Sequence, residues 1–217
     1  MPSISIENYL KVVYNMTREG GRVSTKKLAA RMGLSQPSIT HMMQALHERG
    51  LVDYQPYQGV NLKPEGERMA IRIIRRHRLI ELFLVKTLDM AWDEVDSEAE
   101  LLEHAISDLL ADRIDRYLGH PQIDPHGSPI PDAHGNIVTR DTRKLSDLGV
   151  GDRATVAGVS DSNAEVLRYL TTIGLTLEAD LSILGREPFE GPITIETGGK
   201  TRAISPSMAA RVLVLAR

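Results

Sequence analysis

The stretch from residue 24 to residue 50 constrains the fold of this chain more than any other, because it contains two short helices with their own start and stop signals. Ser24 and Ser35 each stand directly before a run of residues with helical apolar spacing, the position at which serine caps a helix. Gly33 and Gly50 follow these runs and are typical helix ends. We therefore predict a helix, a tight turn and a second helix.

The residues after Gly50 add a β-hairpin to this pair of helices. Two short runs with strand-like composition, 51–55 and 60–63, flank the turn sequence Pro-Tyr-Gln-Gly at 56–59. An amphipathic helix precedes the pair: Ser5 is expected to cap it, its apolar positions span residues 6–16, and it ends at Gly20-Gly21. Helix, helix, turn, helix and hairpin are the parts of a winged helix-turn-helix, a fold that reads double-stranded DNA. The alternative is a plain three-helix packing unit.

The second helix of the pair has an outer face of small and polar side chains, which are of a size to enter a major groove and hydrogen-bond to base edges. Lys27 in the preceding helix is placed to contact phosphate. The candidate DNA-binding residues are Lys27, Ser35, Gln36, Pro37, Ser38, Thr40, His41 and Gln44.

The charge of the chain is unevenly distributed. Residues 1–80 contain 13 basic against 6 acidic side chains, and residues 81–150 contain 6 against 15. Residues 151–217 are nearly balanced, with 7 against 8. A basic first third suits a polyanionic partner and an acidic middle suits cations, although solvated faces of a globular protein would give the same counts.

The acidic middle contains a candidate metal site in two parts. In a helix predicted over 96–118, Glu100, Glu103 and His104 stand at i, i+3 and i+4 and share one face. The apolar side chains on the opposite face, which we expect to point to the core, are Leu102, Ala105, Ile106 and Leu109. The alternative is that Ser97 and Glu100 form a capping box and that Glu103 and His104 belong to a solvated face.

His77 and Glu81 supply the second part. They stand at i and i+4 in a helix predicted to begin at Pro64, within a run (79–85) that is apolar nearly all round and so predicted to be buried. An unpaired charge in such a place is costly, so both side chains need partners. Two helices that turn His and carboxylate side chains towards each other make a site for a divalent metal ion.

A Pro/Gly-rich loop, 119–131, follows these helices. The histidines in and beside it, His120, His126 and His134, are interpreted as surface residues. Beyond about residue 145, short strand-like runs at 154–157, 181–184, 193–196 and 212–215, with one helix near 163–172, predict a small β-barrel.

The chain has no cysteine, which excludes disulfides, iron–sulfur clusters and thiolate zinc sites. No apolar run reaches the length of a membrane span, and the first residues lack the pattern of a secretory signal. We therefore expect a cytoplasmic protein that has no membrane partner.

In this order, the winged helix, His-Arg-Leu-Ile-Glu at 77–81, Glu-Leu-Leu-Glu-His at 100–104, Pro-His-Gly-Ser-Pro-Ile-Pro at 125–131 and the C-terminal β domain resemble the diphtheria-toxin-repressor family of metal-dependent transcriptional regulators. The resemblance covers essentially the whole chain. It implies a mainly α protein with small β elements: a winged helix-turn-helix domain (1–64), a helical dimerisation and metal-binding domain (65–140) and an SH3-like β-barrel (145–217).

The family also implies a homodimer on an inverted-repeat operator, activated by one or two Fe(II) or Mn(II) ions per chain and usually repressing metal-uptake genes. By position, His77, Glu81, Glu103 and His104 match family ligands. Glu100 stands where iron-responsive members have Cys and manganese-responsive members have Glu. The looser correspondences are Asn8 on the first helix, Asp96, and Asp161, Asn163 and Glu165 in the C-terminal domain.

Oxygen ligands without sulfur favour Mn(II), then Fe(II), and do not exclude Zn, Co or Ni. Two other functions are compatible with parts of the pattern. A winged-helix regulator without metal would use only the N-terminal domain. A carboxylate-bridged metalloenzyme would use only the helical metal site, but it would need two Glu-x-x-His motifs, which the sequence lacks.

Overall fold

The computed structural model of the chain describes residues 4–18, 20–160 and 163–216. It separates into two compact units, one formed by Met1–Arg76 with Pro131–Asn136 and the other by His77–Ile130 with Ile137–Arg217. The long helix α4, Pro64–Leu88, contributes its first half to one unit and its second half to the other. The three-domain boundaries predicted from the sequence remain a prediction.

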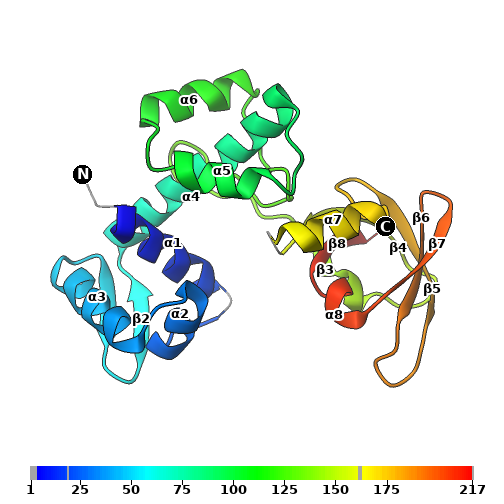
Figure 1. Cartoon of the computed structure of the whole chain (residues 1–217), viewed down its shortest axis with the longest axis horizontal. Coiled ribbons are helices and arrows are strands. Elements are labelled where there is room, and N and C mark those ends of the chain that lie inside the picture. Colours follow the sequence, from blue (N-terminus) through cyan, green and yellow to red (C-terminus); the bar gives the residue numbers. More distant parts are fainter. Residues whose placement is uncertain (1–3, 19, 161–162, 217) are drawn as a thin grey trace. The chain divides into compact units, whose positions relative to one another are not determined.

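The first unit is a winged helix, as the sequence predicts (Figure 1). Its elements are α1 (Ile4–Arg18), α2 (Thr25–Met32), α3 (Gln36–Glu48) and the antiparallel pair β1 (Val52–Gln55) and β2 (Gly59–Leu62). The side chains of Ser24 and Ser35 accept hydrogen bonds from the backbone N–H groups of Lys27 and Ser38, so these two predicted caps are formed. Because each cap satisfies a donor that the first helical turn leaves open, these serines determine where α2 and α3 begin. The cap predicted at Ser5 is wrong, because α1 already begins at Ile4.

Two contacts attach the hairpin to the segment between α1 and α2. Val23 and Val60 exchange both backbone hydrogen bonds, each 2.9 Å long. Arg22 donates to the Asp53 carboxylate and to the backbone oxygens of Asp53 and Gly59. The hairpin is therefore held at its base, while Tyr57 at its tip is fully exposed.

In the second unit, the helix predicted over 96–118 is interrupted, and that prediction is wrong. The structure has α5 (Val95–Leu102), a turn over 103–107, and α6 (Asp108–Tyr117). Ser107 adopts an extended conformation and its side chain accepts from Leu110 N, so it caps a new helix instead of continuing the old one.

The interruption also changes which apolar residues are buried. Leu102 and Leu109, expected to point to the core, are 39% and 69% exposed. Ile106 is partly buried against the residues of α4 and α5, and Ala105 is exposed. The apolar face predicted for one straight helix is therefore divided between the core and the surface.

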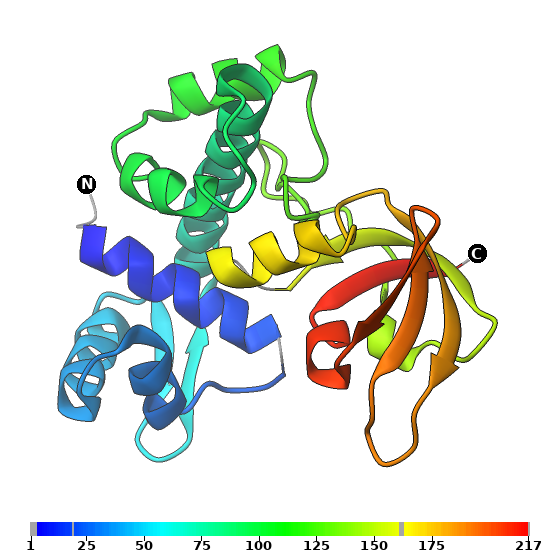
Figure 2. The ribbon, with the colours of Figure 1, turned by 45° about the vertical axis from the view of Figure 1, so that its right-hand side comes forward.

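The C-terminal part of this unit is an antiparallel sheet of six strands in the order β3-β8-β4-β5-β6-β7 (Figure 2). The strands are β3 (Arg143–Lys144), β4 (Arg153–Val159), β5 (Asp180–Arg186), β6 (Ile193–Thr197), β7 (Lys200–Ile204) and β8 (Val212–Ala216). A 3-10 turn (Leu145–Asp147), α7 (Ala164–Thr172) and α8 (Pro206–Ala209) complete it. Leu167 and Leu170 of α7 are fully buried in the same core as the strand residues.

The strands and the helix agree with the sequence prediction, but the closed barrel does not. Within the described ranges, no ladder of hydrogen bonds joins the edge strands β3 and β7. β3 has only two residues, both paired to β8, so it could offer β7 at most a very short ladder on its other edge. The domain is a sheet with two edges.

Gly66, in the first turn of α4, provides a test of the packing between α4 and the wing. An added Cβ would lie 2.0 Å from the backbone oxygen of Leu51, so the helix would have to shift. Alanine favours the helical conformation over glycine by about 1 kcal/mol, but we expect the clash with Leu51 to cost more than this. Gly66→Ala should lower the free energy of unfolding by about 1–3 kcal/mol.

Urea denaturation of the metal-free protein measures this change. Gly149→Ala is the matched control, because the nearest atom to its added Cβ, Asp152 Oδ2, is at an ordinary 3.6 Å. Gly149→Ala should unfold at about the same urea concentration as wild type. If Gly66→Ala did so too, the close contact between α4 and Leu51 would be incorrect.

Candidate functional site

The centre of the site is the imidazole of His77, which has carboxylates on both sides. Its Nδ1 lies 2.5 Å from Glu103 Oε2 and 4.0 Å from Glu100 Oε2. Its Nε2 lies 3.3 Å from Glu81 Oε1 and 3.5 Å from Asp96 Oδ1. α4 supplies His77 and Glu81, and the α5 segment supplies the other three. Two of the groupings that could hold a metal ion share this one histidine.

Most of this cluster is shielded from water. Glu81 and Glu103 are fully buried, whereas Asp96 and Glu100 are partly exposed. Carboxylates that share a buried space repel one another, and burial adds a desolvation penalty to each. A cation within the cluster would relieve both effects, so the donor set fits a divalent ion.

The sequence analysis missed two residues of the candidate site, Asp124 and His126, and its interpretation of His126 as a surface residue was wrong. His126, interpreted as a surface histidine, is buried, and its Nδ1 lies 3.3 Å from Glu81 Oε1. Buried Asp124 joins them, and Glu81, Asp124 and His126 form a third grouping that could hold an ion. The Asp before Pro-His-Gly in an otherwise Pro/Gly-rich loop was the signal that could have revealed it. The other two loop histidines are exposed, as predicted.

A tight turn presents His126 to the cluster. Asp124 Oδ1 accepts from the backbone N–H groups of His126 and Ser128, which closes the turn. Gly127 has φ +86°, and an added Cβ would lie 2.1 Å from Ala157 O of β4, so only glycine fits there. The backbone of His126 is thus fixed between the helices and the sheet.

The buried charges change the protonation of this centre. Burial by itself lowers the pKa of His126, but the hydrogen bond to Glu81 and the charges of Glu81 and Asp124 outweigh it and raise the pKa to about 9. Burial likewise opposes a charge on His77, yet its pKa is raised well above the ordinary value by bonds to Asp96, Glu103 and Glu81. Without metal, these raised pKa values favour the positively charged, doubly protonated form of both imidazoles at neutral pH.

The acids divide into two kinds. Burial would raise the pKa of Glu81, but its bonds to His126 and His77 lower it to about 2. Asp124 behaves oppositely: burial and the neighbouring Glu81 charge raise its pKa to about 6, although Arg78 and His126 oppose the shift. Glu81, which contacts both histidines, is the anion that the two imidazoles share.

The remaining predicted residues of the helical region have mixed positions. His104 Nε2 lies 3.3 Å from Glu103 Oε1, next to the cluster, but in the turn after α5 and not on the helix face with Glu100. The capping-box alternative for Ser97 and Glu100 is wrong, because α5 has Glu94 at its N-cap without a side-chain cap bond. Ser97 instead donates to the backbone oxygen of Glu94.

Four predicted ligands are not brought into this cluster by the described structure. Asn8 belongs to the first unit, where its Oδ1 is buried without a hydrogen-bond partner among the described residues. Asn163 and Glu165 are exposed, and Asn163 Oδ1 caps α7 by accepting from two backbone N–H groups. Asp161 lies outside the described residues. Their roles as ligands remain predictions.

The predicted DNA-binding residues lie together at the start and along one side of α3. Ser35, Gln36, Pro37, Ser38, His41 and Gln44 are exposed, as is Lys27 of α2, and Thr40 is half-buried. Ile39, Met43 and Leu46 on the opposite side are fully buried. The face that carries the polar side chains is therefore free to contact a ligand as large as a duplex.

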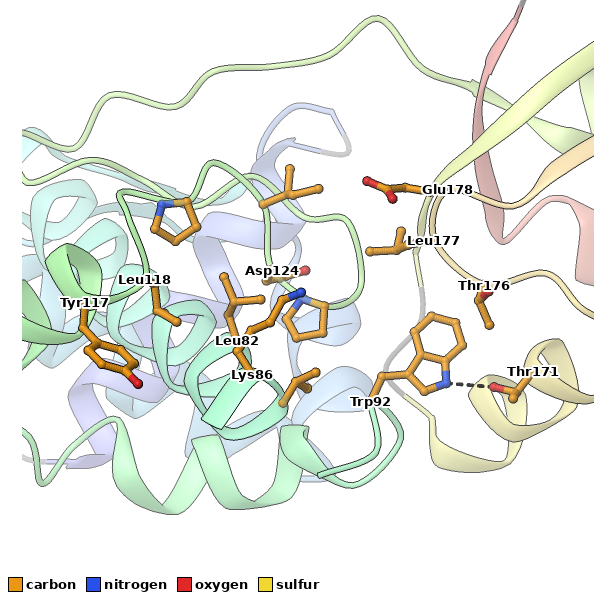
Figure 3. A pocket seen from close by; sticks show the side chains of 14 residues that line it. Leu82, Lys86, Trp92, Tyr117, Leu118, Asp124, Thr171, Thr176, Leu177 and Glu178 are labelled. Atoms are coloured by element: carbon orange, nitrogen blue, oxygen red, sulfur yellow. Dashed lines mark hydrogen bonds between the residues drawn. The ribbon is translucent and has the colours of Figure 1, made fainter. Parts of the chain in front are cut away.

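A cavity of about 760 Å³ lies in the second unit, between the helices and the C-terminal sheet (Figure 3). Trp92 and Thr171 lie at one end of it and Tyr117 and Leu118 at the other, with Leu82 and Asp124 between them. Trp92 also stacks on the His126 ring, with centroids 5.9 Å apart. The cavity therefore borders the metal-site candidate at Asp124.

Comparisons with known proteins agree with this geometry. Residues 1–60 match the model of the iron dependent repressor N-terminal DNA binding domain, residues 63–132 that of the iron dependent repressor metal binding and dimerisation domain, and residues 143–216 that of the FeoA domain. A solved structure titled "Manganese-dependent transcriptional repressor complex with manganese" is 42% identical, covers 98% of this chain and 100% of that one, and has a TM-score of 0.90.

The chain belongs to the diphtheria-toxin-repressor family of metal-dependent transcriptional repressors. The structure of ScaR with bound Zn2+ is 30% identical, with a TM-score of 0.81 over 99% of both chains. The iron-dependent repressor IdeR of Mycobacterium leprae is 31% identical over 162 residues, which are 75% of this chain and 63% of that relative. These repressors are not enzymes, so the metalloenzyme alternative is set aside. Among the described residues of the repressor, no helix is long and apolar enough to span a bilayer.

The protonation of the two histidines predicts opposite pH dependences for the metal-free and metal-loaded repressor. A raised pKa in the folded state stabilises the fold below the unfolded value, near 6.5, and this contribution is lost as pH rises through the folded value, about 9 for His126. The free energy of unfolding in EDTA should therefore fall between pH 6.5 and 8.5. A bound divalent ion replaces these protons, so the stabilisation by Mn(II) should grow over the same range.

Anaerobic urea denaturation at pH 6.5, 7.5 and 8.5, with EDTA or with Mn(II), measures both trends. His126→Gln should flatten each of them, because it removes one of the two titrating imidazoles. Equal pH dependence with and without metal would show that ions and protons do not compete for this cluster.

Proposed function

We propose that this repressor is a homodimer that binds Mn(II) or Fe(II), at one or two ions per chain, and in that form binds an inverted-repeat operator in double-stranded DNA. The observation that carries the proposal is His77, whose two ring nitrogens each face two carboxylates. Such a protein acts in the cytoplasm, where the operator and the metal ions are both found.

The imidazole of His77 can ligate only one ion, through one of its two ring nitrogens. A neutral imidazole has one N–H and one lone pair, so it can ligate an ion through one nitrogen while the other donates to a carboxylate. On the Nδ1 side, Glu100, Glu103 and the adjacent His104 complete a set of nitrogen and oxygen donors. The Nε2–H then donates to Glu81, which keeps the ring in the required orientation.

A second ion would be held by Glu81, Asp124 and His126. All three side chains are buried and their donor atoms lie within 4.8 Å of one another. Glu81 then takes part in both sites, accepting from His77 and ligating the second ion. Glu81 is therefore common to the two proposed sites.

The donors favour manganese or iron over softer metals. Carboxylate oxygens and imidazoles are typical of Mn(II) and Fe(II) sites, and a thiolate at the position of Glu100 would favour softer ions. A similar solved structure is titled as a manganese complex, and ScaR is described with bound Zn2+, so the fold itself does not restrict the metal. Availability in the cell then decides which ion is bound.

The dimer is supported by the exposed apolar side chains of α5 and α6. The exposed side chains on these helices include Leu101, Leu102, Leu109, Leu110 and Tyr117. Apolar side chains gathered on one surface are typical of an interaction site, and the family model that matches this region is a dimerisation domain. We place the two-fold contact on α5 and α6.

For DNA, the exposed side of α3 would enter the major groove, with Gln44 and His41 reading base edges and the N-terminus of the helix near phosphate. Tyr57 at the tip of the wing adds an exposed side chain that the sequence reading did not single out. Because a dimer presents two such helices, an inverted repeat is the expected site.

Replacing His77 tests the metal-dependent function. His77→Ala removes the side chain that the carboxylates of α4 and of the α5 segment share. Loss of a residue that only supports a metal ligand lowers metal affinity by about 10–100-fold, so the loss of His77 itself should lower Mn(II) affinity by more than that. DNA-binding anisotropy titrated with Mn(II), Fe(II) and Zn(II), and with EDTA, should then show little metal response. The dimer should persist in sedimentation.

His120→Ala is the control, because His120 is exposed and its imidazole lies beside Asp115, outside the metal cluster. It should respond to metal as wild type does. DNA binding that is indifferent to EDTA in the wild-type protein would instead favour the winged-helix regulator without metal sensing.

Two substitutions separate base reading from phosphate contact. Gln44→Ala should lower the preference for the operator over random DNA by about 1–3 kcal/mol, because it removes a hydrogen bond to a base edge. Lys27→Ala should weaken binding to both DNAs alike and reduce the slope of log affinity against log salt by about one. Competition and salt titrations measure the two effects, and a loss of preference in Lys27→Ala alone would reverse the assignment.

A further inference from the structure

Trp92 connects the C-terminal domain to the candidate site of the second ion. It lies in the turn between α4 and α5 and is the only tryptophan in the sequence. Its indole Nε1–H donates to Thr171 Oγ1 of α7 at 2.9 Å (Figure 3). Its backbone oxygen lies 2.7 Å from His126 Nε2, and its ring is stacked on the imidazole at 26°.

The contact to the backbone oxygen determines which nitrogen of His126 carries a proton. A carbonyl oxygen can only accept a hydrogen bond, so Nε2 must be the donor. When the ring is neutral, its lone pair is therefore on Nδ1, the nitrogen that lies 3.3 Å from Glu81 Oε1. The tautomer that Trp92 selects is the one that directs a ligand atom at Glu81 and Asp124.

The backbone around His126 is held independently of Trp92. His126 N donates to Asp124 Oδ1, and His126 O accepts from Val159 N of β4. The freedom that remains is the rotation and the tautomer of the imidazole. Trp92 restricts both, by stacking and by hydrogen bonding.

The position of Trp92 depends in turn on α7. The indole is anchored by Thr171, and the neighbouring Asp93 forms an ion pair with Arg168, 3.1 Å apart and one turn earlier on the same helix. Both contacts fix the short turn whose carbonyl group faces His126. A residue of the C-terminal domain thus acts on the metal cluster without touching it.

We propose that Trp92 is a positioning residue for the ion at Glu81, Asp124 and His126, and that Thr171 of α7 holds it in place. The inference rests on the proposed metal-binding function. It makes the occupancy of this second site depend on the docking of the C-terminal domain, through an indole that ligates nothing.

The test is a mutant cycle on the full-length protein, with Mn(II) and Zn(II) as probes. Thr171→Val removes the acceptor of the indole, and Trp92→Phe keeps a stacking ring and the carbonyl but removes the donor. Each variant should bind one of two Mn(II) ions about 10-fold more weakly and the other as wild type does, by calorimetric titration. The double variant should lose no more than either single one, because both changes break the same bond.

Thr172→Val is the matched control. Like Thr171, Thr172 is on α7 and donates its hydroxyl to the carbonyl oxygen four residues earlier, but the indole of Trp92 donates to Thr171. It should bind both ions normally, so a general loss of helix stability cannot imitate the expected result.

A second measurement separates positioning from a merely structural role. In the Zn(II)-loaded, diamagnetic protein, the ¹⁵N shifts of labelled histidines should show His126 ligated through Nδ1 and protonated at Nε2. In Thr171→Val the His126 signals should broaden or report a mixture of the two nitrogens. The His77 signals should not change.

The outcomes distinguish this inference from the function on which it rests. If the wild-type protein binds one ion and His126 is not a ligand, the second site and this inference are both wrong while the first site stands. If two ions bind and Thr171→Val matches Thr172→Val in affinity and in spectrum, only the role of Trp92 is overturned. Ligation of His126 through Nε2 in wild type would also overturn it.

Discussion

The interaction on which the centre of this protein depends is the repulsion among buried carboxylates. Glu81, Glu103 and Asp124 are all buried, and Asp96 and Glu100 approach the same histidine from its partly exposed side. In the metal-free protein, protons on His77 and His126 supply the compensating charge. Because each proton sits where an ion would bind, the features that stabilise the empty centre are those that a divalent ion replaces.

Helix α4 places this electrostatic centre where it can influence the DNA-binding unit. Its residues up to Arg76 belong to the winged-helix unit, and His77 is the first residue of the other. A ligand at His77 would therefore be bound where the two units divide along α4. The role of Asn8 of the first unit as a ligand remains a prediction.

The second site depends on more of the fold than the first. Glu81 comes from α4, but Asp124 and His126 come from a loop that is held against β4 by Gly127 and tied to α7 through Trp92. The FeoA-like domain thus contributes contacts to the proposed second site in the helical domain.

Several features followed from local sequence and were confirmed. Ser24 and Ser35 cap α2 and α3 because a cap needs only the residues of one turn, and the hairpin after Gly50 is equally local. The break at Ser107 was missed because Ser107 can be an internal residue or a cap, and the apolar spacing allows either. The strands were predicted correctly because each one is visible in its own short run of residues. Whether the sheet closes into a barrel depends on pairing between the edge strands β3 and β7, which no local pattern indicates.

The sequence by itself determined the winged helix, the place of α4, and the common face of His77 and Glu81 on that helix, because periodicity and spacing reflect helix geometry directly. Only the tertiary structure decided the fate of His126. A histidine in a Pro/Gly-rich loop has no periodicity to indicate its surroundings. Its burial beside Glu81 depends on Gly127 meeting β4 and on Trp92 meeting α7, contacts between residues about 30 to 80 positions apart.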